Sequence, residues 1–301
     1  FEEINSLLHS ACRCGSLCKC RQLSYKEFLG ECEKHCYGES LGKLVKPIVS
    51  TERLMFSNRS TKCVRFEFLA ALHDLLIDEN SFHPENYVFD FTREDPFTFN
   101  FREESNVGET NSTLWHHLTT KERILDPSKE MVVGIILYLD GLNVDNFGKQ
   151  SMEPVSFSLN IFNRQYRAQE SAWRILGYLP DFDSLYASRS VNPNMKANDY
   201  HQMLSLILNS MKEIIDIDEG IEWKFRFVRN GVDEFYTRNM KFVLHYVIGD
   251  TKGNDMLCGR FASHSNTKSL CRDCNCLTEN ADNPNTYCDF LTMNELKEMT
   301  K

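Results

Sequence analysis

The chain has 301 residues, of which 42% are hydrophobic and 26% are charged, a composition typical of a folded globular protein. No apolar stretch is long enough to cross a bilayer and the first residues lack a signal-peptide pattern, so we expect a nuclear or cytoplasmic protein that is neither secreted nor membrane-bound. The net charge of −9 argues against non-specific binding to nucleic acids.

Residues 1–40 form a cysteine-rich segment that we interpret as a possible zinc module. Cysteines are concentrated near the two ends of the chain and none lies between residues 64 and 257, a distribution that favours metal binding over disulfides. Cys-x-Cys pairs are less typical of zinc fingers than Cys-x2-Cys pairs, so a degenerate finger is the alternative. The candidate ligands in this segment are Cys12, Cys14, Cys18 and Cys20, followed by Cys32, His35 and Cys36.

The leading segment is also the basic part of the chain. Residues 1–65 carry a balance of +4, which leaves −13 for residues 66–301. Lysines and arginines between the first cysteines suggest contacts with phosphate groups. Residues 41–130 follow as a helical or irregular linking region, in which apolar residues from Phe68 to Leu76 recur at helical spacing.

Residues 131–257 change to an alternation of strands and one long helix. The run from Met131 to Leu139 is almost entirely apolar, which predicts a strand buried on both faces, and it ends in Asp140-Gly141. Further strands are predicted at 153–162 and 173–179, then a helix capped by Asn198 or Asp199 with an apolar stripe from Tyr200 to Ile215, and finally strands at 223–228 and 242–248. This order predicts an α/β fold with a ribonuclease H-like core, a mixed sheet with flanking helices.

Two of the predicted strands end in an aspartate. Asp140 follows the first strand, and Asp250 follows the last strand after Gly249. Carboxylates at neighbouring strand ends are suitable ligands for Mg²⁺ or Mn²⁺ in a two-metal phosphoryl-transfer site. The alternative is structural, because Asp-Gly and Gly-Asp pairs are also common in turns.

A second cysteine cluster follows at residues 258–290. Cys271-x2-Cys274 has the spacing of half a tetrahedral zinc site, and we expect a structural Zn²⁺ there. Buried reduced thiols are the alternative. The other candidate ligands are Cys258, His264, Cys276 and Cys288. Residues 291–301 resemble the start of a truncated helix, so we expect the sequence to be a fragment.

Three stretches of sequence together resemble a family of transposases. They are LYLDGLNVDNFGKQSMEPVSFSLNIFN at 137–163, AWRILGYLPDF at 172–182, and the segment from Ile248 to Cys276, which joins Gly249-Asp250 to the cysteine knuckle. These stretches are similar to the Kyakuja–Dileera–Zisupton (KDZ) superfamily and to the related Plavaka-like elements. The resemblance covers about residues 131–290.

The resemblance implies a DDE-type transposase with a ribonuclease H-like fold and a Cys-rich, zinc-knuckle-like insertion directly after the second acidic residue. Asp140 matches the first acidic residue of the family motif and Asp250 the second. The third acidic residue of the family is a Glu on a helix beyond a helical insertion, and we expect this sequence to end before that helix. Glu295 and Glu298 are the nearest candidates. The implied activity is metal-dependent cleavage and strand transfer at transposon ends, with DNA as partner and a homo-oligomer in the transposition complex. The alternative is an inactive, zinc-stabilised module derived from a transposase, which binds DNA or protein.

Overall fold

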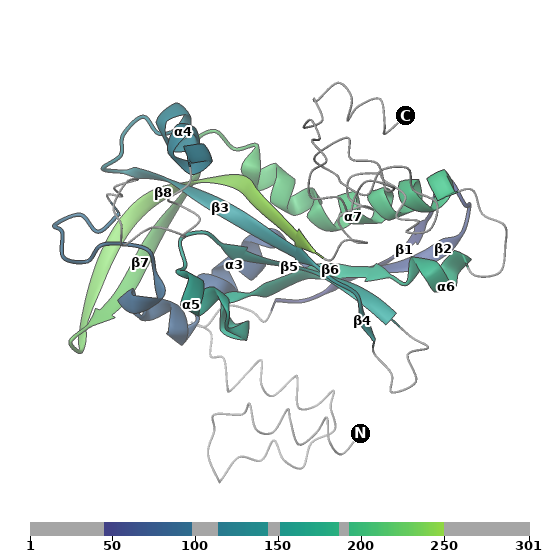
Figure 1. Ribbon diagram of the computed structural model, residues 1–301, viewed down its shortest axis with the longest axis horizontal. Helices are drawn as coiled ribbons and strands as arrows, with labels where there is room; N and C mark the ends of the chain where they lie inside the picture. Colours follow the sequence, from purple (N-terminus) through teal and green to yellow (C-terminus); the bar gives the residue numbers. More distant parts are fainter. Residues whose placement is uncertain (1–44, 98–113, 144–150, 187–192, 250–301) are drawn as a thin grey trace, which may run out of the picture. The chain divides into compact units, whose positions relative to one another are not determined.

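The computed structural model describes residues 45–97, 114–143, 151–186 and 193–249. The chain divides into two compact units, Phe1–Pro47 and Ile48–Lys301, and the elements below belong to the second unit. Within the described residues, eight strands form one sheet (Figure 1). They are β1 (Ile48–Arg53), β2 (Ser60–Arg65), β3 (Glu130–Leu139), β4 (Leu142–Asn143), β5 (Ser151–Leu159), β6 (Arg174–Pro180), β7 (Ile221–Arg229) and β8 (Val232–Gly249).

The sheet is mixed, and its order is β1-β2-β6-β5-β3-β8-β7, with β4 paired to β5. All of these neighbours are antiparallel except β3 and β8, which run parallel. The predicted mixed sheet with flanking helices is therefore confirmed. The strands predicted at 131–139, 153–162, 173–179 and 223–228 correspond to β3, β5, β6 and β7, although β5 ends at Leu159.

Helices cover both faces of the sheet. On one face the Phe68 ring of α3 lies 5.0 Å from the Phe157 ring of β5 and 5.9 Å from the Phe242 ring of β8. On the other face Ile124, which follows α4, packs with Val132 and Val243. This two-sided cover explains why β3 is an apolar run rather than an alternating strand. The helices are α3 (Phe68–Leu76), α4 (Leu114–Arg123), α5 (Arg164–Arg167), α6 (Phe182–Tyr186) and α7 (Pro193–Ile215), with short 3-10 helices η3 (Glu79–Phe82), η4 (Pro84–Asn86) and η7 (Glu170–Ala172).

The long helix α7 has the predicted apolar stripe, but the prediction of its start was wrong. Met203 and Ile207 are buried, as their spacing indicated. Asp199, predicted as a helix cap, lies inside α7 and is fully buried. Its carboxylate accepts the backbone N–H groups of Phe56 at 3.0 Å and Ser57 at 3.1 Å, and also the Tyr186 hydroxyl. A tertiary role in bracing the turn between β1 and β2 therefore replaces the local capping role.

β7 and β8, predicted as two separate strands, form a hairpin. Arg229 pairs with Val232, so Asn230 and Gly231 form a two-residue turn, and both have positive φ angles of 50° and 76°. Asn-Gly favours this kind of turn because both residues tolerate the left-handed region. β8 continues far beyond the hairpin and lies alongside β3 (Figure 1).

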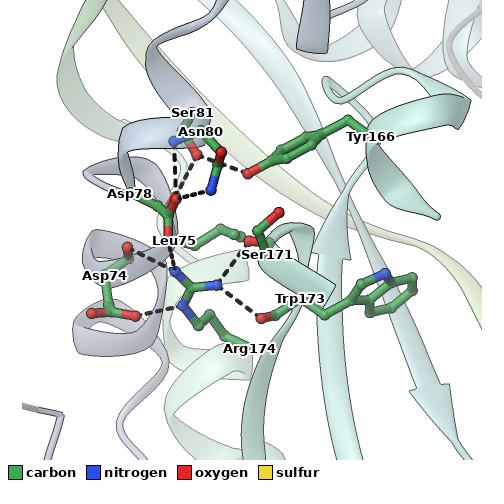
Figure 2. A network of polar contacts seen from close by, with 9 residues as sticks. All are labelled: Asp74, Leu75, Asp78, Asn80, Ser81, Tyr166, Ser171, Trp173 and Arg174. Atoms are coloured by element: carbon green, nitrogen blue, oxygen red, sulfur yellow. Dashed lines mark hydrogen bonds and ion pairs between the residues drawn. The ribbon is translucent and has the colours of Figure 1, made fainter. Parts of the chain in front are cut away.

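A network around Arg174 joins the start of β6 to the end of α3. Figure 2 shows the guanidinium between Asp74 and Asp78, with Arg174 Nη2 3.0 Å from the Asp78 carboxylate. The same side chain donates to the carbonyl oxygens of Ser171 and Trp173. Because the arginine side chain is only 18% exposed, these acceptors replace the water that it loses on folding.

Candidate active site

Asp140 lies at the end of the central strand β3, at the edge where the apolar core meets solvent. Leu139 is fully buried, whereas Asp140 is half-buried and Gly141 is exposed. The Tyr138 hydroxyl donates a hydrogen bond of 2.8 Å to Asp140 Oδ2. The Tyr138 ring in turn meets the Trp173 ring edge-on, with centroids 6.0 Å apart. Tyr138 thus orients one carboxylate oxygen while its own ring is braced by the indole.

The parallel ladder between β3 and β8 determines which parts of the two strands meet at this edge. Tyr138 pairs with Ile248 and Leu139 pairs with Gly249. Leu139 and Gly249 are the residues that directly precede Asp140 and Asp250 in the sequence. The described strands therefore end side by side, immediately before the two predicted metal ligands.

The donor chemistry at this edge suits a hard divalent cation. A carboxylate is the preferred kind of ligand for Mg²⁺ and Mn²⁺. At a half-buried position, fewer water molecules compete with the carboxylate for the ion. Asp140 alone does not make a site, and no group of three or more potential metal-binding side chains occurs among the described residues. A metal centre here needs further carboxylates.

The other predicted site residues lie outside the described part of the chain. Asp250, the third-acid candidates Glu295 and Glu298, and both cysteine clusters belong to this group. The cysteine-cluster residues are Cys12, Cys14, Cys18, Cys20, Cys258, His264, Cys271, Cys274, Cys276 and Cys288.

A buried polar cluster beside β3 was not predicted from the sequence. Asn160, which follows β5, is fully buried; its backbone N–H donates to the Gly134 carbonyl at 2.8 Å and its Oδ1 accepts the Gly134 N–H at 2.6 Å. This arrangement fixes the amide orientation, so Asn160 Nδ2 faces His116 Nδ1 at 3.1 Å and His245 Nδ1 at 3.4 Å. Both imidazoles must then accept at Nδ1, which requires their neutral form.

The two imidazoles of this cluster are stacked, with ring centroids 6.0 Å apart and an interplanar angle of 9°. Burial, reinforced by nearby His117, lowers the pKa of His116 to about 4. Burial likewise lowers the pKa of His245 to about 4, with smaller contributions from His116 and Arg167. The cluster is therefore uncharged at neutral pH.

A cavity of about 200 Å³ lies next to this cluster and far from Asp140. Its wall includes Phe89, Phe97, Thr120 and Glu130. Glu130 and Leu139 are the two ends of the ten-residue strand β3, which places them about 30 Å apart at roughly 3.3 Å per residue. The cavity is therefore separate from the end of β3 at which Asp140 lies.

Comparisons with known proteins give one family match. The model of a family described as Plavaka transposase matches residues 58–300. No curated protein matches the chain. Among the described helices, none has the length and apolar character to span a membrane.

Proposed function

Because the chain belongs to the Plavaka transposase family, we propose that it is the catalytic region of a DDE-type transposase, in which Asp140 and Asp250 together bind Mg²⁺ or Mn²⁺. Family membership implies a DNA substrate and, in general, a divalent metal cofactor. The observation that carries the proposal is the pairing of Leu139 with Gly249, one residue before each aspartate.

The strand order supports a ribonuclease H-like core for this proposal. β3, β5 and β6 follow one another as antiparallel neighbours, α7 covers one face, and β8 then returns parallel to β3. The two strands that end before an aspartate are therefore adjacent in the sheet. The hairpin partner β7 occupies the outer edge and leaves this central arrangement unchanged.

In the proposed site, Asp140 and Asp250 hold the cation, and Tyr138 keeps Asp140 oriented through its 2.8 Å hydrogen bond. Two bound ions would favour attack of a hydroxyl on a DNA phosphodiester and stabilise the oxygen that leaves. Water is the first nucleophile and releases a 3′-hydroxyl; this hydroxyl then attacks a phosphodiester of the target DNA. Each step forms one P–O bond and breaks another.

Substitution of the two aspartates tests this function. We expect Asp140→Asn and Asp250→Asn each to abolish cleavage of DNA that carries the element ends, because the amide removes the charge that holds the ion. Asp218→Asn is the matched control, since it makes the same change at an exposed turn and should leave cleavage intact. Cleavage retained by either active-site variant would refute the proposal.

A transposase-derived module without catalytic activity is the second candidate. The charge of −13 over residues 66–301 favours it, because an acidic surface opposes binding to the DNA backbone. Mn²⁺ binding separates the two candidates: a crystal soaked in Mn²⁺ should show an ion between Asp140 and Asp250 in an active enzyme and none in a relic.

A structural zinc ion is part of both candidate functions, the active transposase and the inactive module. We propose that Cys271 and Cys274 bind one Zn²⁺, completed by two ligands from Cys258, His264, Cys276 and Cys288, and that it braces the chain after Asp250. The Cys-x2-Cys spacing supports this assignment. The N-terminal cysteines Cys12, Cys14, Cys18 and Cys20 are weaker candidates for a second ion.

A further inference from the structure

The ladder between β3 and β8 contains a bulge. Ile135 pairs with Leu244, but the next residue, Ile136, pairs with Tyr246, so the ladder passes over His245. From there the pairing continues without a break to Leu139 and Gly249. Bulges are rare between parallel strands and are enriched next to active sites, where they re-aim side chains.

The bulge decides which residue of β8 lies opposite the end of β3. If His245 entered the ladder opposite Ile136, Leu139 would face Ile248 instead of Gly249. Every later residue of β8 would then move by about 3.3 Å along the strand, and its side chain would turn to the opposite face of the sheet.

Burial specifies this register only weakly. The side chains at the end of β8 are almost equally exposed on both faces of the sheet: Leu244 is 41% exposed, Tyr246 40%, Val247 38% and Ile248 44%. A slip by one residue would therefore exchange faces of similar environment at little hydrophobic cost. Something other than the apolar pattern has to hold the register.

Asn160 and His245 provide that hold. Asn160 is fixed to β3 by its two hydrogen bonds with Gly134, and its Nδ2 also contacts His245 Nδ1. The contact exists because residue 134 is glycine: a Cβ there would lie 2.7 Å from His245 Nδ1 and 2.8 Å from Asn160 Cγ. The His245 imidazole is thus held beside β3, although His245 itself pairs with no residue of β3.

We propose that Asn160 and His245 are positioning residues for the metal site, because the bulge they hold keeps Leu139 opposite Gly249, the residues that directly precede the proposed ligands Asp140 and Asp250. This inference rests on the proposed function for its catalytic meaning. The register itself is independent of that function.

Two variants of the full chain separate the register from the loss of the imidazole. His245→Ala removes the side chain but leaves the extra backbone residue, so the ladder is free to slip. Deletion of His245 also removes the imidazole, but it removes the extra residue too, and Tyr246 then follows Leu244 with the correct alternation of faces. We expect His245→Ala to lower the affinity for Mn²⁺ by about 10- to 100-fold and the deletion to leave it unchanged.

Mn²⁺ binding is measured by electron paramagnetic resonance, and binding at the proposed site is the portion that is lost when Asp140→Asn is introduced. Thermal unfolding of both variants is the control for folding. Equal affinities of the two variants, whether both reduced or both unchanged, would overturn the inference. If Asp140→Asn removes no Mn²⁺ binding, the proposed function fails, and crystal structures of the variants decide the register. Leu139 opposite Ile248 in His245→Ala supports the inference, and Leu139 still opposite Gly249 refutes it.

Discussion

Acidification should destabilise the folded chain through the two buried histidines. The folded state keeps His116 and His245 neutral, with pKa values lowered to about 4 chiefly by burial, whereas an unfolded histidine has a pKa of about 6.5. Between these two values the unfolded chain binds protons that the folded chain does not. The free energy of unfolding therefore falls as the pH is lowered from about 6.5 towards 4.

The size of this effect follows from the difference in pKa. At pH 5, linkage gives a loss of about 2 kcal/mol for His116 relative to neutral pH. His245 is less buried, so solvent screening reduces its share to about 1 kcal/mol. The expected total of about 3 kcal/mol is a large part of the 5–15 kcal/mol typical of a domain.

Urea denaturation of the chain at pH 7.5 and pH 5, followed by tryptophan fluorescence, measures this loss. His116→Asn keeps an acceptor for Asn160 but does not titrate in this range, so it should remove about 2 kcal/mol of the pH dependence. His83→Asn, at a side chain that is 52% exposed, is the matched control and should retain the loss of stability at pH 5. An identical loss of stability at pH 5 in the unaltered chain and in His116→Asn would refute the reasoning.

Three further predictions concern stability and metal content. Arg174→Met should lower the free energy of unfolding by about 2 kcal/mol in urea denaturation, because it leaves the Asp78 carboxylate without its cation. Asp199→Ala should cost about 3 kcal/mol and speed hydrogen exchange in the turn between β1 and β2, since two backbone N–H groups of the turn and the buried Tyr186 hydroxyl lose their acceptor; unchanged exchange would contradict the bracing role. Purified chain should contain about one zinc per chain by elemental analysis, and Cys271→Ser with Cys274→Ser should remove it; zinc that persists would place the site elsewhere.

The central strands were predictable because their residues are constrained locally. The apolar run from Met131 to Leu139 can only be a strand or helix buried on both sides, and its length and β-branched residues favour a strand. β1 and β2 were not predicted, since they are short, lie towards one edge of the sheet and have only one fully buried residue between them, Cys63. The hairpin turn at Asn230-Gly231 was present in the sequence as a known turn pair and could have linked β7 to β8.

Asp140 and the buried cluster of His116, Asn160 and His245 show the same contrast between local and long-range constraints. Asp140 could be singled out because a single feature, an acid after an apolar run, marks it in the sequence. His116, Asn160 and His245 come from three distant parts of the chain, and no spacing relates them. Only the folded chain brings them together. In the same way it brings the donors of Phe56, Ser57 and Tyr186 to Asp199, so tertiary contacts overrode the local cap signal there.

The position of β8 affects how the protein can fold during synthesis. β8 is the last of the described strands in the chain, yet it lies next to the central β3. About 70 residues separate the end of β6 at Pro180 from Gly249, which takes roughly 3–14 s to translate at 5–20 residues per second. During that time the edge of the apolar strand β3 that later pairs with β8 has no partner strand on the growing chain. Folding of this sheet should therefore depend on chaperones that cover such an edge, and on the long-range pairing that finally closes it.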